Sequence, residues 1–238
     1  MFGIPERYLK NEPLAPKNFI QRDMKKAQKD RIKDNLLEAR LMWQIVGEDV
    51  PSLVNERYKC SVIMGFDVRL KAIKGSAFFA ELVQHMIKEP CVIRFYDHKE
   101  EVYSFAHKRL SKSVEGNVVI EDRVETLPLS VQFADKTKDR LKQCLAYDAL
   151  LNKADKLSLY LEAMVKAFII SHPKLYTGIE ELLDRKLWYN RDEVLVLLGR
   201  LNELVRLNGL ARAKKLPGER AKLNMEIKEL LKILEVVK

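Results

Sequence analysis

The segment from Pro90 to Leu110 constrains the fold more than any other part of the chain. Two runs rich in β-branched and aromatic residues, 91–96 and 101–107, flank the polar stretch 97–100. Such runs on either side of a short polar stretch predict an antiparallel hairpin. Because His98-Lys99 suits a two-residue turn poorly, we expect a loop of about three to five residues. A register slip of one residue would exchange the two faces of this hairpin.

Alternating apolar and polar residues predict two strands before the hairpin and a fifth strand, 118–125, after it. The first strand would bury Leu37, Ala39, Leu41, Trp43 and Ile45 on one face. The second would be a single long strand that buries Cys60, Val62, Met64, Phe66, Val68 and Leu70. A helix that begins at Gly75-Ser76 and ends before Pro90 would connect the second strand to the hairpin.

Residues 1–19 contain Pro5, Pro13 and Pro16 and predict an extended arm, since proline disfavours a regular helix. A basic surface helix is expected over 17–33, where the apolar residues are few but helically spaced. The resulting order, α-β-β-α-β-β-β, predicts an α+β fold. We expect a mostly antiparallel sheet of about five strands with helices packed on it.

The turn-forming segment 126–138 predicts a boundary between a sheet domain, residues 1–130, and a helical region, residues 131–238. The last two helices resemble an antiparallel coiled-coil hairpin, because their apolar residues step by three and four. Its seam would contain Val194, Leu198, Leu201, Val205, Leu223, Ile227, Leu230, Leu234 and Val237. Pro217 fits the first turn of the second helix.

The chain holds 43 Lys and Arg against 34 Asp and Glu, a net charge of +9. This excess fits a polyanionic partner such as DNA, because cations that neutralise phosphates release condensed counterions. Residues 17–33 hold seven basic side chains against two acidic ones, and 206–222 hold six against one. We expect phosphate contacts from Lys25, Lys26, Arg94, Lys108, Arg109, Arg212, Lys214 and Lys215. A solvated lysine-rich surface is the alternative explanation.

The hairpin interleaves basic and aromatic residues, a pattern by which a sheet can stack bases and hold phosphates. These residues are Arg94, Tyr96, Tyr103, His107, Lys108 and Arg109. Aromatic residues in strands are more often buried in the core, so the register decides between the two interpretations.

Several classes of site find no support in the sequence. No GxxxxGK[ST], GxGxxG, HExxH, paired CxxC or GxSxG pattern is present. We therefore assign no catalytic residue, no metal ligand and no cofactor. The three widely spaced cysteines indicate a reducing compartment, and no apolar run approaches the roughly 18 residues of a membrane span. We expect a cytoplasmic protein that does not bind membranes.

A metal-dependent nuclease is one alternative function, since such an enzyme needs carboxylates around a strand pair with a lysine nearby. Asp67, Asp97, Glu101, Glu121 and Asp122, with Lys99 or Lys108, lie on or beside predicted strands. Carboxylates that simply solvate the sheet are the simpler interpretation.

Several segments resemble the prokaryotic family catalogued as domain of unknown function 4391. They are Phe2-Gly3-Ile4-Pro5, Pro16-Lys17-Asn18-Phe19, Trp43, Pro90-Cys91-Val92-Ile93-Arg94-Phe95 and Ser104-Phe105-Ala106-His107-Lys108. The family often has Ala-Tyr-Lys where this chain has Ala106-His107-Lys108. The resemblance implies an uncharacterised protein encoded among SNF2-type helicases and DNA methyltransferases in restriction or antiviral gene clusters. It assigns no catalytic residue.

These observations together favour a non-enzymatic, DNA-directed accessory subunit of a restriction or antiviral defence system. It would dock on a helicase or methyltransferase partner and contact DNA through basic surfaces. Two alternatives remain open: the metal-dependent nuclease, and a structural adaptor that binds a protein through the coiled coil.

Overall fold

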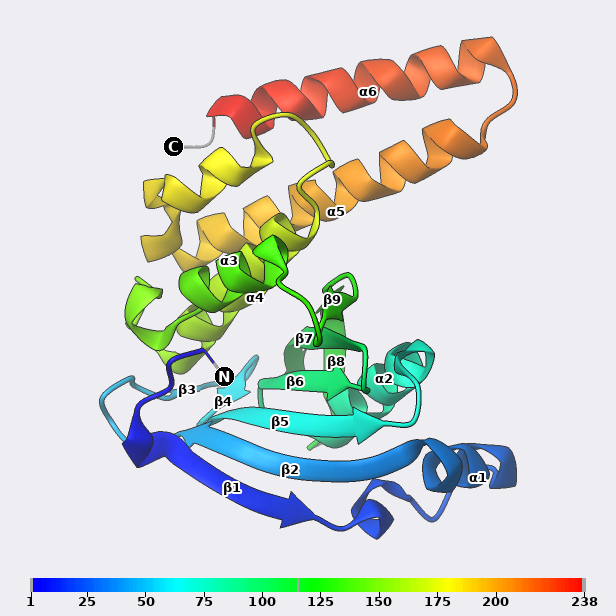
Figure 1. Ribbon diagram of the computed structural model, residues 1–238. Helices are drawn as coiled ribbons and strands as arrows, with labels where there is room; N and C mark the ends of the chain where they lie inside the picture. Colours follow the sequence, from blue (N-terminus) through cyan, green and yellow to red (C-terminus); the bar gives the residue numbers. More distant parts are fainter. Residues whose placement is uncertain (1, 115, 237–238) are drawn as a thin grey trace. The chain divides into compact units, whose positions relative to one another are not determined.

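A computed structural model of the chain describes residues 2–114 and 116–236 (Figure 1). The chain divides into two compact units, Met1–Ser171 and His172–Lys238, and each is described by itself. The strands of the first unit are β1 (Leu9–Leu14), β2 (Leu36–Ile45), β3 (Leu53–Val54), β4 (Lys59–Cys60), β5 (Ile63–Leu70), β6 (Cys91–Tyr96), β7 (Glu100–Leu110), β8 (Val118–Glu125) and β9 (Leu129–Ser130). Its α-helices are α1 (Lys26–Asn35), α2 (Ser76–Met86), α3 (Lys136–Cys144) and α4 (Lys156–Ser171).

The fold is α+β with a mostly antiparallel sheet, as the sequence predicts. Within the described residues the main sheet has seven strands in the order β1-β2-β5-β6-β7-β8, with β9 paired to β7. The expected number of about five was too low because part of the N-terminal arm pairs with β2 as β1, and because β9 joins the sheet. Strands β5 and β6 are parallel, and α2 makes the crossover between them. Strands β3 and β4 form a separate two-stranded ribbon.

The expected single buried face of β2 is wrong, because two irregularities interrupt its alternation. The register with β5 shifts between Leu36 and Glu38 and again between Leu41 and Trp43. Ala39 and Leu41 therefore belong to the core under α1 and α2, whereas Trp43 and Ile45 line a cavity on the α4 side. Leu37 is 53% exposed. A β-bulge adds one residue to a strand and so reverses the faces that follow it.

The long strand expected over 60–70 is two strands. Cys60 ends β4, which pairs with β3, and β5 begins at Ile63. Phe66, Val68 and Leu70 do join the core as predicted. Residues 59–60 turn away from the sheet to form the ribbon, so the apolar alternation there reflects two short elements.

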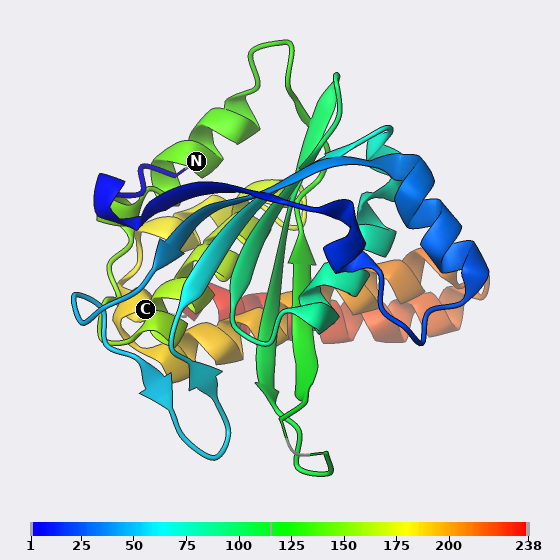
Figure 2. The same cartoon turned by 90° about the horizontal axis from the view of Figure 1, so that it is seen from below.

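The helices α1 and α2 cover one face of the sheet. The expected basic helix begins later than predicted, at Lys26, and a short 3-10 helix, η2 (Pro16–Phe19), precedes it. Ile32 of α1 and Phe79, Ala80 and Val83 of α2 are buried in the same core. Figure 2 shows α1 leading directly into β2 at the edge of this face.

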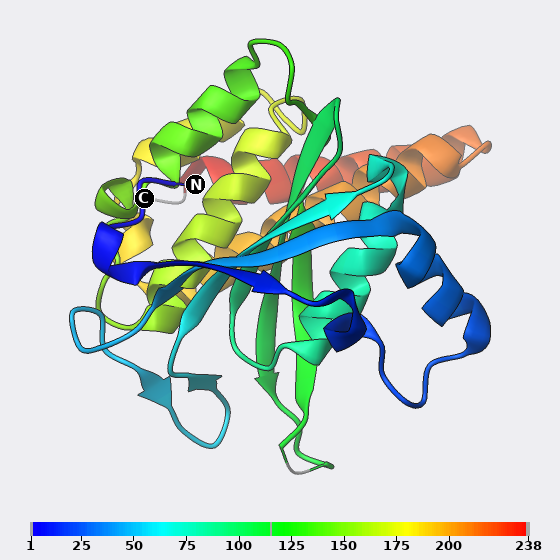
Figure 3. The ribbon, with the colours of Figure 1, turned by 60° about the horizontal axis from the view of Figure 1, so that its bottom comes forward.

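The opposite face is covered by α3 and α4, which lie side by side (Figure 3). The Tyr160 hydroxyl of α4 bonds to the backbone of β6 and β7, and Lys138 of α3 pairs with Glu101 of β7. Lys156 donates to the carbonyls of Gly47 at 2.8 Å and Val50 at 2.6 Å. These contacts attach α3 and α4 to the sheet, and the first compact unit extends to Ser171.

The second unit contains α5 (Arg191–Ala213) and α6 (Pro217–Val236), which pack on each other. Pro217 is the first residue of α6, as predicted. Val194, Leu198 and Leu201 are buried, but Val205 is 39% exposed. Leu234 is the single buried residue in the described part of α6, while Leu223, Ile227 and Leu230 are half-buried. Val237, expected in the seam, lies outside the described residues.

Candidate functional site

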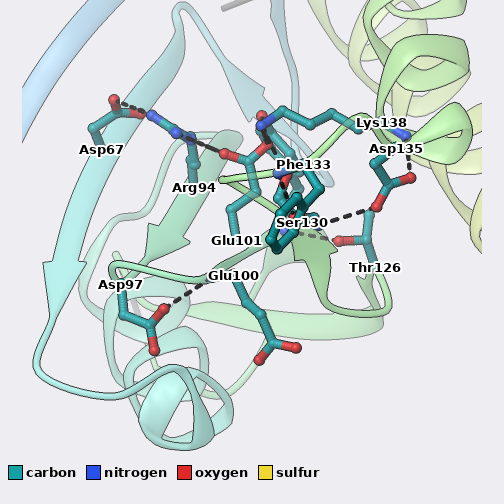
Figure 4. Close-up of polar contacts among 11 residues, drawn as sticks. Asp67, Arg94, Asp97, Glu100, Glu101, Thr126, Ser130, Phe133, Asp135 and Lys138 are labelled. Carbon is teal, nitrogen blue, oxygen red and sulfur yellow. Dashed lines mark hydrogen bonds and ion pairs between the residues drawn. The ribbon is translucent and has the colours of Figure 1, made fainter.

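A cluster of charged side chains lies on the face of the sheet that α3 covers, and we call it the arginine–carboxylate cluster. It consists of Asp67, Arg94, Glu101 and Lys138 (Figure 4). The parallel register sets Asp67 of β5 beside Arg94 of β6, so both side chains leave the same face. Glu101 enters from β7, and Lys138 reaches it from α3.

Arg94 bridges the two carboxylates. Its Nη1 lies 3.0 Å from Asp67 Oδ2, and its Nη2 lies 2.6 Å from Glu101 Oε2. The other oxygen of Glu101 accepts from Lys138 Nζ at 3.0 Å and from the Tyr103 hydroxyl at 3.2 Å. The fully buried Glu101 carboxylate is thus held on both oxygens.

Electrostatics in this cluster are governed by burial and by the close charges. Burial raises the pKa of Asp67 above its usual range, although Arg94 acts against that shift. Burial acts to lower the pKa of Arg94, but the charges of Asp67 and Glu101 outweigh it and raise that pKa. Asp67 Oδ1 is buried and has no hydrogen-bond partner. It is the one acceptor of the cluster still open to a donor or a cation.

The cluster is electrically balanced, with two carboxylates against two cations. The guanidinium of Arg94 occupies the position between Asp67 and Glu101 that a bridging cation would need. Across residues 2–114 and 116–236, no group of three or more His, Cys, Asp or Glu side chains is placed to hold a metal ion.

The other carboxylates considered for a nuclease lie elsewhere. Asp97 accepts hydrogen bonds from the backbone N–H groups of Ile73, Lys99 and Glu100 and so fixes the hairpin loop. Burial acts to raise the pKa of Asp97, but these backbone hydrogen bonds prevail and lower it. Glu121 and Asp122 lie on β8 near His107. The structure therefore divides Asp67, Asp97 and the Glu121–Asp122 pair among three places.

The interleaved basic and aromatic residues of the hairpin are buried or half-buried. Lys108 is 5% exposed, and its Nζ donates to the carbonyls of Ile87 at 2.8 Å and Glu89 at 3.2 Å. Burial lowers the pKa of Lys108. Arg109 Nε lies 2.8 Å from Glu121 Oε1. Tyr103 and His107 are buried, so the core interpretation of these two side chains is the one that fits the structure.

The remaining predicted phosphate contacts are exposed, in two separate places. Lys25 and Lys26 stand at the start of α1. Arg212 lies in the last turn of α5, and Lys214 and Lys215 lie in the loop between α5 and α6. Lys214 pairs with Glu219 at 3.2 Å, while no ion pair within the described chain involves Lys25, Lys26, Arg212 or Lys215.

Sequence reasoning missed Lys138 and Tyr160 as partners of the hairpin. Both lie in the segment that the sequence assigned to a separate helical region. The signal available was local: α4 carries only the charged residues Lys156, Glu162 and Lys166 in a sequence that is otherwise apolar on all sides, the pattern of a helix buried all round.

A family model described as a domain of unknown function, DUF4391, matches residues 2–234. The match covers nearly the whole chain. The chain belongs to this family. Searches of curated proteins and of solved structures gave no match. The sequence match thus confirms the family. The binding roles proposed for this DUF4391 chain rest on its own residues. No helix in the described part of the chain has the length and apolarity needed to cross a membrane.

Proposed function

We propose that this protein is a DNA-directed accessory subunit of a restriction or antiviral defence system. It docks on a helicase or methyltransferase partner and contacts DNA phosphates through exposed cations. The defence setting rests on the family resemblance, and the DNA contact rests on charge. A cytoplasmic location is part of the proposal, and the buried thiols of Cys60 and Cys91 support it.

The observation that carries the proposal is the charge at the connection between α5 and α6, which we call the hairpin tip (residues 206–222). Arg212, Lys214 and Lys215 are exposed there, and Glu219 is the one acidic residue in this stretch of sequence. Arg220 donates to the Lys214 carbonyl at 3.1 Å, which holds the loop. Exposed cations with few counter-charges are the electrostatic basis of non-specific DNA binding.

Lys25 and Lys26 supply a second contact in the first unit, at the start of α1. We leave Arg94, Lys108 and Arg109 out of the contact set, because their side chains bond to carboxylates or backbone carbonyls within the fold.

The test is DNA binding by the full chain across a salt series, with and without magnesium. We compare Lys214→Gln/Lys215→Gln with Lys228→Gln/Lys232→Gln, an equal charge loss on α6 away from the tip. The log–log salt slope should fall by about 0.9 for each lost phosphate contact in the tip variant alone. Equal slopes in both variants would overturn the tip assignment. Cleavage that requires magnesium and is lost in Asp67→Asn would establish the nuclease alternative instead.

The adaptor function is a second candidate, favoured by one observation on α6. Met225, Ile233 and Val236 are 68%, 47% and 73% exposed, although the helix packs on α5. We propose that α5 and α6 form an antiparallel coiled coil whose apolar stripe a protein partner completes. Ile233→Glu should then release the partner without unfolding the sheet unit, whereas retained binding would contradict this function.

A further inference from the structure

A groove in the first unit lies between α2 and the stretch formed by the start of α1 and the residues before it. It encloses about 350 Å³. Gln21 and Gln28 line it on the α1 side, and Phe78, Glu81, Leu82, His85 and Met86 line it on the α2 side. We call the three apolar residues Phe78, Leu82 and Met86 the floor. The DNA contacts proposed above share Lys25 with the rim of this groove but leave its apolar residues unused.

The floor is a second apolar side of α2. Phe79, Ala80 and Val83 already bury one side of the helix in the core. Phe78, Leu82 and Met86 recur every fourth residue and remain half-buried. Phe78 and Leu82 pack against the edge of that core and still line the groove. A stripe with this spacing matches the apolar face of a second helix laid along it.

Beside the groove, the two cations Lys25 and Arg31 outnumber the one carboxylate of its lining, Glu81, and this excess of positive charge selects a partner. Lys25 lies one turn before Gln28 on α1, and Arg31 lies one turn after it, so the cations follow the same side of the helix. The basic segment 17–33 holds seven basic residues against two acidic ones. A partner helix with carboxylates beside its apolar stripe would therefore be attracted, and a basic one repelled.

We propose that this groove binds an acidic amphipathic helix of a partner protein. The inference rests on the docking role proposed above and names its surface. The partner's apolar residues would cover Leu82 and Met86, and its carboxylates would face Lys25 and Arg31. Methionine adapts its shape readily and is frequent at surfaces that accept helical peptides.

A single-stranded nucleic acid fits the groove less well. The guanidinium of Arg31 stacks over the Phe78 ring at 4.3 Å from the centroid, so that ring face is already covered. Leu82 and Met86 are aliphatic and offer no platform for base stacking.

The experiment titrates the full-length protein with three labelled probes and follows fluorescence anisotropy. The probes are a designed 18-residue helix of Leu and Glu, its counterpart of Leu and Lys, and a single-stranded oligonucleotide. The acidic helix should bind at least tenfold more tightly than the basic one. Leu82→Gln and Met86→Gln should each weaken it at least fivefold, and Lys25→Glu/Arg31→Glu should reverse the preference.

Lys228→Glu/Lys232→Glu, the same change of charge in the second unit, should leave peptide binding unchanged. Thermal melting of Met86→Gln, a half-exposed position, checks that weaker binding does not reflect unfolding. No preference for the acidic helix, or equal binding by all groove variants, would overturn the proposal. Oligonucleotide binding lost in Met86→Gln would assign the groove to nucleic acid. DNA binding at the hairpin tip is measured with the tip variants. Loss of peptide binding in the groove can therefore be told apart from loss of DNA binding at the tip.

Discussion

The Tyr160 hydroxyl donates a hydrogen bond to the carbonyl of Cys91 at 2.9 Å. It also accepts one from the N–H of Ala106 at 2.7 Å. Cys91 and Ala106 lie two residues beyond the Ile93–Ser104 pair, where the ladder between β6 and β7 would otherwise continue. A side chain of α4 thus takes the place of a strand hydrogen bond and fixes α4 to the hairpin.

Removing this hydroxyl leaves a buried N–H and a buried carbonyl without partners. Tyr160→Phe should therefore lower the free energy of unfolding by about 2 kcal/mol. Urea denaturation measures the change, and Tyr189→Phe, at a residue 65% exposed, is the matched control. Equal stability of Tyr160→Phe and the natural chain would show that water or the strands themselves satisfy these groups.

Neutralising Glu101 should be more damaging, because Arg94 and Lys138 would lose the buried charge between them. We expect Glu101→Gln to reduce the free energy of unfolding by about 3 kcal/mol, the usual cost of breaking a buried ion pair. Glu100→Gln, one residue earlier in the same strand, should change it by less than about 0.5 kcal/mol. Similar losses in both variants would mean that the cluster contributes no more than an exposed charge.

The pH dependence of stability should show the role of Asp97. Its pKa is lowered in the folded chain, so the charged form is favoured by folding. This contribution is present above the unfolded pKa, about 3.9, and is lost as the pH falls toward the folded value. Asp97→Asn should cost about 1 kcal/mol at pH 7 and progressively less below pH 4.

Denaturation of Asp97→Asn at pH 7, 5 and 3 checks that dependence, with the exposed Asp148→Asn as the control. A cost that stays constant from pH 7 to pH 3 would show that the loop depends on the hydrogen bonds of Asp97 and not on its charge.

Gly65 must be a glycine, because a Cβ at this position would overlap the indole ring of Trp43. Gly65→Ala should destabilise the sheet unit by about 2 kcal/mol or prevent its folding. The rigid ring cannot yield, so Trp43→Leu in the same chain should recover part of the lost stability. The control is Gly199→Ala, in open space on α5, which should stabilise the chain by up to about 1 kcal/mol. A neutral Gly65→Ala variant would contradict the close packing of these two residues.

Local patterns in the sequence predicted the elements whose signals are local. The hairpin, the helix that ends before Pro90 and the start of α6 at Pro217 all lie where propensity and spacing place them. Each of these elements is set by residues close in the chain: β-branched runs, a 3-4 apolar stripe and proline in a first helical turn.

The rest depended on pairing between distant segments. The bulges of β2 cannot be read from its alternation, because only the register with β5 shows that Trp43 leaves the face of Leu41. Glu101 and Lys138 are unremarkable charges in the sequence, and only the packing of α3 on the sheet joins them. The base and phosphate contacts expected on the hairpin depended on the hairpin's own register, and Tyr103 and Lys108 are both buried.

Phosphate contact by the cations of the hairpin tip is tested first by the salt dependence of duplex DNA binding by the full chain. We expect a steep log–log slope that falls by about 1.8 in Lys214→Gln/Lys215→Gln, at about 0.9 for each lost phosphate contact. The slope should stay unchanged in Lys228→Gln/Lys232→Gln. Absence of binding at low salt, or a slope that the tip variant does not alter, would contradict phosphate contact at the hairpin tip.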